Sequence, residues 1–153
     1  MGRRPIPNRR GRRPFCASLA HMMVNEEGRV LSVGVDIIEI ARVAQAIERW
    51  GQRFLDHVYT PAEQARYRGR LPELAARFAA KEAISKALGT GLMGISWVEM
   101  EVLSDGRGKP LVTLYGRALA RAQELGLGEW AISLSHSDGN AVAFVVARES
   151  PLM

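Results

Sequence analysis

The chain is poor in cysteine and histidine and has no long apolar segment. Cys16 is the only cysteine among 153 residues, so an internal disulfide and a cysteine-based metal cage are both excluded. No apolar run approaches the ~20 residues that a membrane-spanning helix requires, and the three histidines include no closely spaced pair. We therefore expect a cytoplasmic protein without membrane contact, whose candidate metal ligands are carboxylate oxygens.

Positive charge is concentrated at the N-terminus. Six arginines lie within the first thirteen residues, and without them the formal net charge changes from +5 to −1. The high pI therefore describes a tail, and the near-neutral remainder argues against specific nucleic-acid binding. We expect residues 1–28 to form a disordered basic extension and residues 29–150 to form one domain. The tail is either dispensable or a weak contact for an anionic surface.

The domain is predicted to begin with a strand and a helix. Residues 30–36 are rich in valine and end at an acid, which predicts a short buried strand. Apolar residues at helical spacing then predict a helix over residues 40–50, which Gly51 stops.

Two more helices are predicted next. Thr60, Pro61 and Glu63 have the order of an N-cap, a first helical residue and the second half of a capping box. A longer helix of about four turns begins at Pro72 and is closed by Gly89.

The second half of the domain alternates hairpins with a helix. The predicted segments are strands 98–103 and 111–116, a helix over 117–126, and strands 130–137 and 140–147. This order predicts an α+β fold in which an antiparallel sheet is packed with helices. The tight turns argue against a doubly wound parallel sheet.

Asp36 ends the first predicted strand. A buried carboxylate is costly unless it is paired, hydrogen-bonded or bound to a metal. Asp36 is therefore either the cap of the helix that follows or a ligand in a site. The residues alone leave both interpretations open.

Glu82 and Lys86 lie four residues apart on the long helix. One interpretation is an exposed i,i+4 ion pair. The other is that both side chains face a ligand, because Glu82 shares a face with the apolar Phe78 and the helix runs into a glycine-rich segment that could approach a phosphate. Asp36, Glu82 and a lysine would suit Mg²⁺ and a pyrophosphate.

Five sequence blocks in order resemble the holo-[acyl-carrier-protein] synthase family, the small bacterial 4'-phosphopantetheinyl transferases. These blocks are GVDIIEI, RFLDHVYTPAE, RFAAKEAISKALGTG, GRGKP and SLSHS. The resemblance implies transfer of the phosphopantetheine arm of coenzyme A to a serine of apo-acyl carrier protein, with release of adenosine 3',5'-bisphosphate. It also implies a homotrimer with sites between subunits.

The resemblance assigns the site residue by residue. Asp36 and Glu82 match the Mg²⁺ ligands, and with Lys86 they form the catalytic set. Coenzyme A contacts are implied for a group spread along the blocks: Arg77, Lys86, Gly89, Thr90, Gly91, Lys109, Pro110 and His136. His57 departs from the arginine expected at that position. The proton of the carrier serine could pass to water or to Asp36.

Arg42 and Arg49 lie seven residues apart, on one face of the first helix. They are either solvated or, as the resemblance implies, contacts for the acidic carrier protein. Two other functions stay open at this point. One is a coenzyme A or nucleotide-binding module that has lost transfer, and the other is nucleic-acid binding through the tail.

Overall fold

The computed structural model describes residues 22–24, 26 and 28–151. Its helices and strands give the predicted α+β order. They are β1 Met22–Val24, β2 Val30–Glu39, α1 Ile40–Trp50, α2 Gln52–Val58, α3 Pro61–Tyr67, α4 Leu71–Ala87, the 3-10 turn η1 Trp97–Glu99, β3 Met100–Ser104, β4 Pro110–Leu114, α5 Gly116–Glu124, β5 Leu127–His136 and β6 Asn140–Glu149.

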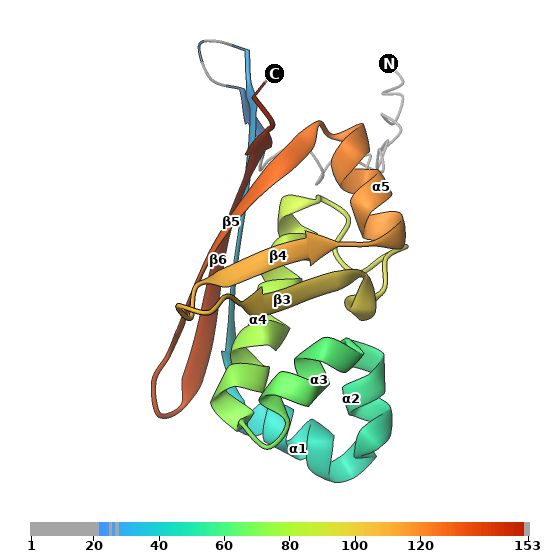
Figure 1. Ribbon diagram of the computed structural model, residues 1–153, viewed down its shortest axis with the longest axis vertical. Coiled ribbons are helices and arrows are strands. Elements are labelled where there is room, and N and C mark those ends of the chain that lie inside the picture. Colours follow the sequence, from blue (N-terminus) through green and yellow to red (C-terminus); the bar gives the residue numbers. More distant parts are fainter. Residues whose placement is uncertain (1–21, 25, 27, 152–153) are drawn as a thin grey trace, which may run out of the picture.

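The strands form two antiparallel sheets. The larger has the order β1-β2-β6-β5, and the smaller is the hairpin β3-β4. In Figure 1 the long strands β5 and β6 run along one side of the molecule, while α1, α2 and α3 gather at one end. The hairpin turn between β5 and β6 is closed by the amide of Ser137, which donates to Asn140 O at 2.9 Å.

Helix α4 is the centre of the core. Its alanines are buried against β2 and β6 on one side and against the β3-β4 hairpin on the other. The buried members of this cluster include Ala79, Ala80, Ala83, Ile84 and Ala87. Because alanine side chains are short, the helix backbone can come close to the sheet. The residues of α4 that are not alanine are therefore held at fixed positions relative to β2.

Most predicted helix boundaries are confirmed. Thr60 caps α3, where its hydroxyl accepts from the amide of Glu63 at 3.2 Å, and the Glu63 carboxylate accepts from the amide of Thr60 at 2.9 Å. Gly51 ends α1 with φ 55, a conformation that favours glycine.

The first strand differs from its prediction. It was expected to be short and buried over 30–36, but it continues to Glu39 because β6 pairs with it as far as Asn140. Only one face is covered, since Val35 and Ile37 are 54% and 66% exposed.

The described structure begins before the predicted start of the domain at residue 29. Met22–Val24 pairs with β2 although it falls in the predicted extension of residues 1–28. Disorder was predicted for residues 1–28, of which residues 1–21, 25 and 27 lie outside the described part, and the boundary at residue 29 stays a prediction. None of the helices in the described part combines the length and the apolar character that a membrane crossing requires.

Candidate functional site

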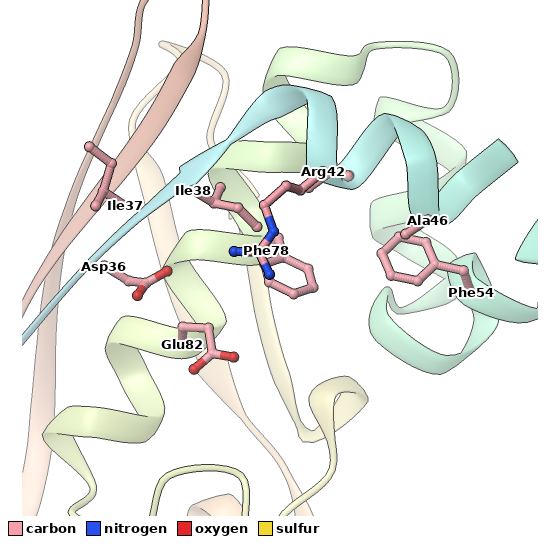
Figure 2. Close-up of a pocket in the computed structure, with 9 residues that line it drawn as sticks. Asp36, Ile37, Ile38, Arg42, Ala46, Phe54, Phe78 and Glu82 are labelled. Atoms are coloured by element: carbon pink, nitrogen blue, oxygen red, sulfur yellow. The ribbon is translucent and has the colours of Figure 1, made fainter. Parts of the chain in front are cut away.

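A hollow of about 480 Å³ opens between β2, α1, α2 and α4. Its lining mixes apolar and charged side chains: Asp36, Ile37, Ile38, Arg42, Val43, Ala46, Phe54, Phe78 and Glu82. Figure 2 shows the carboxylates of Asp36 and Glu82 on neighbouring elements, with Arg42 reaching from α1 toward Phe78. The predicted sharing of one helix face by Phe78 and Glu82 is confirmed, because both line the hollow.

Asp36 lies within β2, opposite Ala143 of β6. The helix α1 begins four residues later with Glu39 as its N-cap residue, so the interpretation of Asp36 as a helix cap is wrong. Its side chain is 19% exposed and accepts a hydrogen bond from Lys86 Nζ at 2.9 Å. Strand β2 thus presents this carboxylate to α4.

Lys86 crosses from α4 to β2. Its Nζ donates to Asp36 Oδ1 at 2.9 Å and to Val35 O at 2.8 Å, and its side chain is 46% exposed. The exposed i,i+4 pair between Glu82 and Lys86 is not formed among the described residues, where the lysine pairs with Asp36. Lys86 therefore joins the site through the strand.

Glu82 is partly buried beside Asp36. Burial raises the pKa of Glu82 above its usual value, the negative charge of Asp36 raises it further, and Lys86 lowers it. The net rise means that the positive charge of Lys86 does not fully offset burial and the charge of Asp36 at the ionised Glu82 carboxylate. A bound cation would supply further positive charge, and two carboxylates suit Mg²⁺.

The donor set fits a magnesium ion that is held only in part by protein. Among the described residues, no group of three or more His, Cys, Asp or Glu side chains is arranged to hold a metal. Two carboxylates are nevertheless the usual protein share of a Mg²⁺ site, because this ion keeps waters and takes further oxygens from substrate phosphates. Asp36 and Glu82 fit that role.

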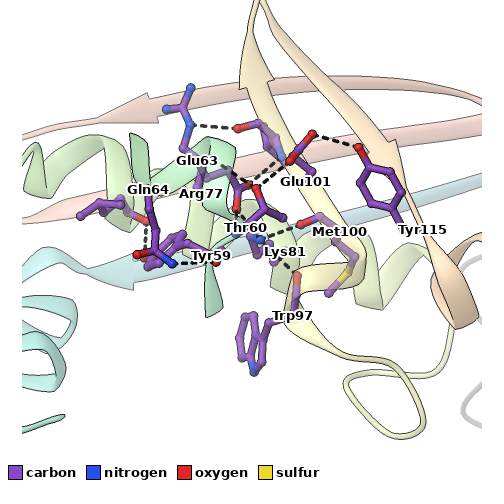
Figure 3. A network of polar contacts seen from close by, with 12 residues as sticks. Tyr59, Thr60, Glu63, Gln64, Arg77, Lys81, Trp97, Met100, Glu101 and Tyr115 are labelled. Carbon is purple, nitrogen blue, oxygen red and sulfur yellow. Dashed lines mark hydrogen bonds and ion pairs between the residues drawn. The ribbon is translucent and has the colours of Figure 1, made fainter. Parts of the chain in front are cut away.

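The buried pair of Lys81 and Glu63 fixes the helix next to this site. Lys81 is fully buried, and its Nζ donates to Glu63 Oε2 at 2.7 Å, Met100 O at 2.6 Å and Trp97 O at 3.1 Å. Figure 3 shows how this network joins α3, α4 and β3. Because Lys81 directly precedes Glu82 in the sequence, the network holds α4 in the rotation that turns Glu82 toward the hollow.

The glycine-rich loop follows α4 at the end that carries Lys86. Gly89 and Gly91 have φ 72 and 55, so both use the left-handed region that glycine favours. The Thr90 hydroxyl donates to Gly91 O at 2.8 Å. The sequence therefore puts this loop directly after the phosphate-binding candidate Lys86.

Arg77 points away from the hollow. Its guanidinium donates to Tyr67 Oη and Ser104 Oγ, both at 2.8 Å, and to Val102 O at 3.3 Å. Its guanidinium carbon also lies 3.8 Å from the centroid of the Tyr67 ring, and the residue is 5% exposed. This packing connects α4 to the β3-β4 hairpin and lends no support to a coenzyme contact from Arg77 within one chain.

Three other predicted coenzyme contacts also lie apart from the carboxylates. Lys109 lies in the turn between β3 and β4, Pro110 is the first residue of β4, and His136 is the exposed last residue of β5. These positions fall outside the described lining of the hollow. A single chain thus brings together Asp36, Glu82 and Lys86, but not the full predicted set.

The two predicted partner-binding arginines are both exposed on α1. Arg42 lines the hollow, and the guanidinium of Arg49 lies 5.0 Å from the ring centroid of the neighbouring Trp50. Neither forms an ion pair with a carboxylate in the described part of the chain. Both charges are therefore available to an acidic partner.

The sequence patterns gave no sign of Phe54 as part of the hollow. Its ring lies 6.3 Å from that of Phe78, in a stacked arrangement that forms the apolar wall. Phe54 lies in α2, far from Phe78 in sequence, so no local pattern connects the two rings.

Comparisons with known proteins point to one superfamily. A model of the 4'-phosphopantetheinyl transferase superfamily matches residues 32–144. The holo-[acyl-carrier-protein] synthase of Herpetosiphon aurantiacus is 54% identical over 124 residues, which cover 76% of this chain and 98% of that protein.

Two solved structures are similar along nearly their whole length. The Helicobacter pylori holo-[acyl-carrier-protein] synthase in complex with coenzyme A has a TM-score of 0.69 at 30% identity, with 75% of this chain and 98% of that chain covered. The Plasmodium yoelii acyl carrier protein synthase with ADP bound has a TM-score of 0.71 at 32% identity, with 77% and 94% covered. The predicted α+β fold is therefore confirmed.

Proposed function

The chain belongs to the 4'-phosphopantetheinyl transferase superfamily, and on this premise we propose that it is a Mg²⁺-dependent holo-[acyl-carrier-protein] synthase. The enzyme transfers the 4'-phosphopantetheine group of coenzyme A to a serine of apo-acyl carrier protein and releases adenosine 3',5'-bisphosphate. The observation that carries the proposal is that Asp36 of β2 and Glu82 of α4 line one hollow, while Lys86 of α4 contacts Asp36 at 2.9 Å.

Asp36 and Glu82 would hold the magnesium ion. When bound, the ion draws charge from the pyrophosphate oxygens and so makes the phosphorus easier to attack. Glu82 favours a cation because its carboxylate is partly buried beside a second negative charge. Asp36 is held in place for this role by the strand pairing of β2 with β6 and by Lys86.

Lys86 would stabilise the charge that develops on the phosphoryl oxygens during transfer. Its side chain is 46% exposed, so the ammonium group could move from Asp36 to a phosphate, or contact both. The Gly89 to Gly91 loop would lie along the coenzyme, because glycine backbone allows close approach. The carrier serine would lose its proton to water or to Asp36.

The exposed apolar face of the large sheet supports a homotrimer. Val35 and Phe144 lie opposite each other on β2 and β6 and are 54% and 46% exposed, and Ile37 on the same face is 66% exposed. A contiguous apolar patch of this kind marks an interaction surface. We propose that identical copies cover it. A neighbouring copy would then be able to supply the contacts expected from Lys109, Pro110 and His136.

Arg42 and Arg49 would bind the acidic carrier protein. Their charges lie on one exposed face of α1 and are not neutralised by described carboxylates. Arg42 also lines the hollow, so the carrier serine would approach between this arginine and the carboxylates. With the carrier as its partner, the chain would act in fatty acid biosynthesis in the cytoplasm.

The test is to incubate the protein with apo-acyl carrier protein, coenzyme A and Mg²⁺ and to measure the mass of the carrier. We expect a gain of one phosphopantetheine, which Glu82→Ala and chelation of the metal should each abolish. Glu124→Ala, on the exposed side of α5, is the matched control and should retain full transfer. Coenzyme A binding without any mass gain would instead favour a binding module, and normal turnover by Glu82→Ala would contradict the site.

A further inference from the structure

The backbones of β2 and α4 meet at Gly34. A Cβ atom at this residue would lie 1.9 Å from Ala83 O, 2.8 Å from Ala83 C and 3.1 Å from Ala87 N. Ordinary contacts of a Cβ atom begin near 3.4 Å, so any other residue here would have to move the helix away from the strand by about 1.5 Å. The close approach is therefore available only to glycine.

A hydrogen bond also joins β2 to α4, two residues before Gly34 on the strand. The hydroxyl of Ser32, which is fully buried on the same face of β2, donates to Ala87 O at 2.6 Å. Since alternate residues of a strand share a face, Ser32, Gly34 and Asp36 all point toward α4. Ser32 and Gly34 form the contact between β2 and α4, which we call the junction, and Asp36 belongs to the proposed site.

On α4, too, the residues of the junction are next to the residues of the proposed site. Ala83 follows Glu82, and Ala87 follows Lys86, so the two backbone positions that Gly34 contacts are the neighbours of the two functional side chains. The distance of 2.9 Å between Lys86 Nζ and Asp36 Oδ1 is measured across this junction. Any increase in the separation of β2 and α4 moves Asp36 away from Glu82 and Lys86 together.

We propose that Gly34 is a positioning residue of the transfer reaction: by letting the backbones of β2 and α4 touch, it holds Asp36 close enough to Glu82 for both carboxylates to bind one cation. The proposal rests on the proposed function, since it concerns the magnesium site assigned there. A displacement of about 1 Å in a preorganised site costs up to about a hundredfold in rate, so the effect of losing the close approach should be large.

The test measures the metal site apart from turnover. Mn²⁺ binding to the whole protein, without substrates, is followed by water-proton relaxation for wild type, Gly34→Ala and Gly139→Ala. Gly139 is the matched control, because a Cβ atom there would meet no described atom within 4 Å. We expect Gly34→Ala to weaken Mn²⁺ binding by tenfold or more and to raise the Mg²⁺ concentration for half-maximal transfer by a similar factor, while Gly139→Ala changes both by less than twofold.

The possible outcomes separate the two proposals. If wild type binds no Mn²⁺, the metal part of the proposed function fails, and the role of Gly34 falls with it. If wild type binds Mn²⁺ and folded Gly34→Ala binds it equally well, only the positioning role is overturned. If Gly34→Ala does not fold, Ser32→Ala tests the same junction: binding weakened two- to fivefold supports the proposal, and unchanged binding overturns it.

Discussion

Two lysines of α4 each form an ion pair with a carboxylate from another element, and the surroundings of the two pairs differ. Lys81 and Glu63 are fully buried, and both groups have further hydrogen-bond partners in the backbone. Lys86 is 46% exposed, and its partner Asp36 is 19% exposed. The first pair lies inside the protein, while the second lies at a solvent-accessible site.

The difference shows how one helix can contain both an ion pair that stabilises the fold and an ion pair that can open to solvent. A buried pair whose donors and acceptors are all occupied cannot exchange partners without a large penalty. A half-exposed pair costs little to open, because water can replace either partner. Lys81 thus holds α4 in place, and the pair of Lys86 with Asp36, five residues further on, can open at little cost, as the proposed contact with a phosphate requires.

The largest effect should come from breaking the buried pair. Lys81→Met leaves the carboxylate of Glu63 buried without its cation, and such changes cost about 3–5 kcal/mol in the free energy of unfolding. Urea unfolding measured at neutral pH would detect this loss. The double variant Lys81→Met with Glu63→Gln removes the unpaired charge and should recover much of the stability. A decrease in the free energy of unfolding of less than about 1 kcal/mol in Lys81→Met would mean that the buried pair stabilises the fold no more than an exposed pair does.

Lys86→Met should change the free energy of unfolding little and the rate of transfer strongly. Because the pair with Asp36 is half exposed, the free energy of unfolding should change by only about 0–1 kcal/mol. The rate of phosphopantetheine transfer should fall by roughly 10²–10³, the usual loss when one group that stabilises developing charge is removed. Urea unfolding and the rate of carrier modification are measured on the same preparation. Loss of stability in proportion to activity would mean that Lys86 is also structural.

Arg42 and Arg49 extend the comparison to cations without a described carboxylate partner. Replacing both by glutamate should weaken binding of apo-acyl carrier protein by roughly tenfold or more, since the charges that attract the acidic partner become repulsive. Binding to wild type should already weaken as salt is raised from 0.05 to about 0.5 M, because exposed charges are screened. Surface plasmon resonance measures both, and unchanged affinity in the double variant would remove α1 from the carrier surface.

Local patterns predicted the helices well because their signals lie within a few residues. The capping box of Thr60 and Glu63 and the stop at Gly51 are examples, and both are confirmed. The end of β2 was predicted too early, because the pairing of its last residues depends on β6, which lies about a hundred residues later. Asp36 was consequently considered as a helix cap.

The sites required contacts that no local pattern contains. Asp36 and Lys86 are separated by 50 residues, and their contact exists because β2 and α4 touch at Gly34. The role of Lys81 was missed for the same reason, since its carboxylate partner Glu63 belongs to α3. Resemblance to a family grouped Asp36, Glu82 and Lys86 in one predicted site, and in the structure Asp36 and Glu82 line one hollow while Lys86 contacts Asp36. Its predicted coenzyme contact at Arg77 finds no support in the packing of one chain.

The smallest effect should be a pH dependence that belongs to Glu82. Because the folded state raises the pKa of Glu82 above its usual value of 4.5, protonated Glu82 stabilises the fold below that pH, and this stability is lost as the pH rises through the raised pKa. Glu82→Gln is neutral at every pH. In the presence of a chelator it should match wild type near pH 4 and become the more stable protein near pH 7, as measured by urea midpoints.

Adding Mg²⁺ shows whether the stability difference between wild type and Glu82→Gln comes from the charge of Glu82 or from its packing. The ion should stabilise wild type near neutral pH, because it adds positive charge next to the ionised Glu82 carboxylate, and it should stabilise Glu82→Gln much less. Glu124→Gln is the matched control, because this exposed carboxylate on α5 lies away from the hollow. A difference between Glu82→Gln and wild type that stays constant from pH 4 to about pH 7 would mean that the pKa of Glu82 is raised neither by burial nor by Asp36.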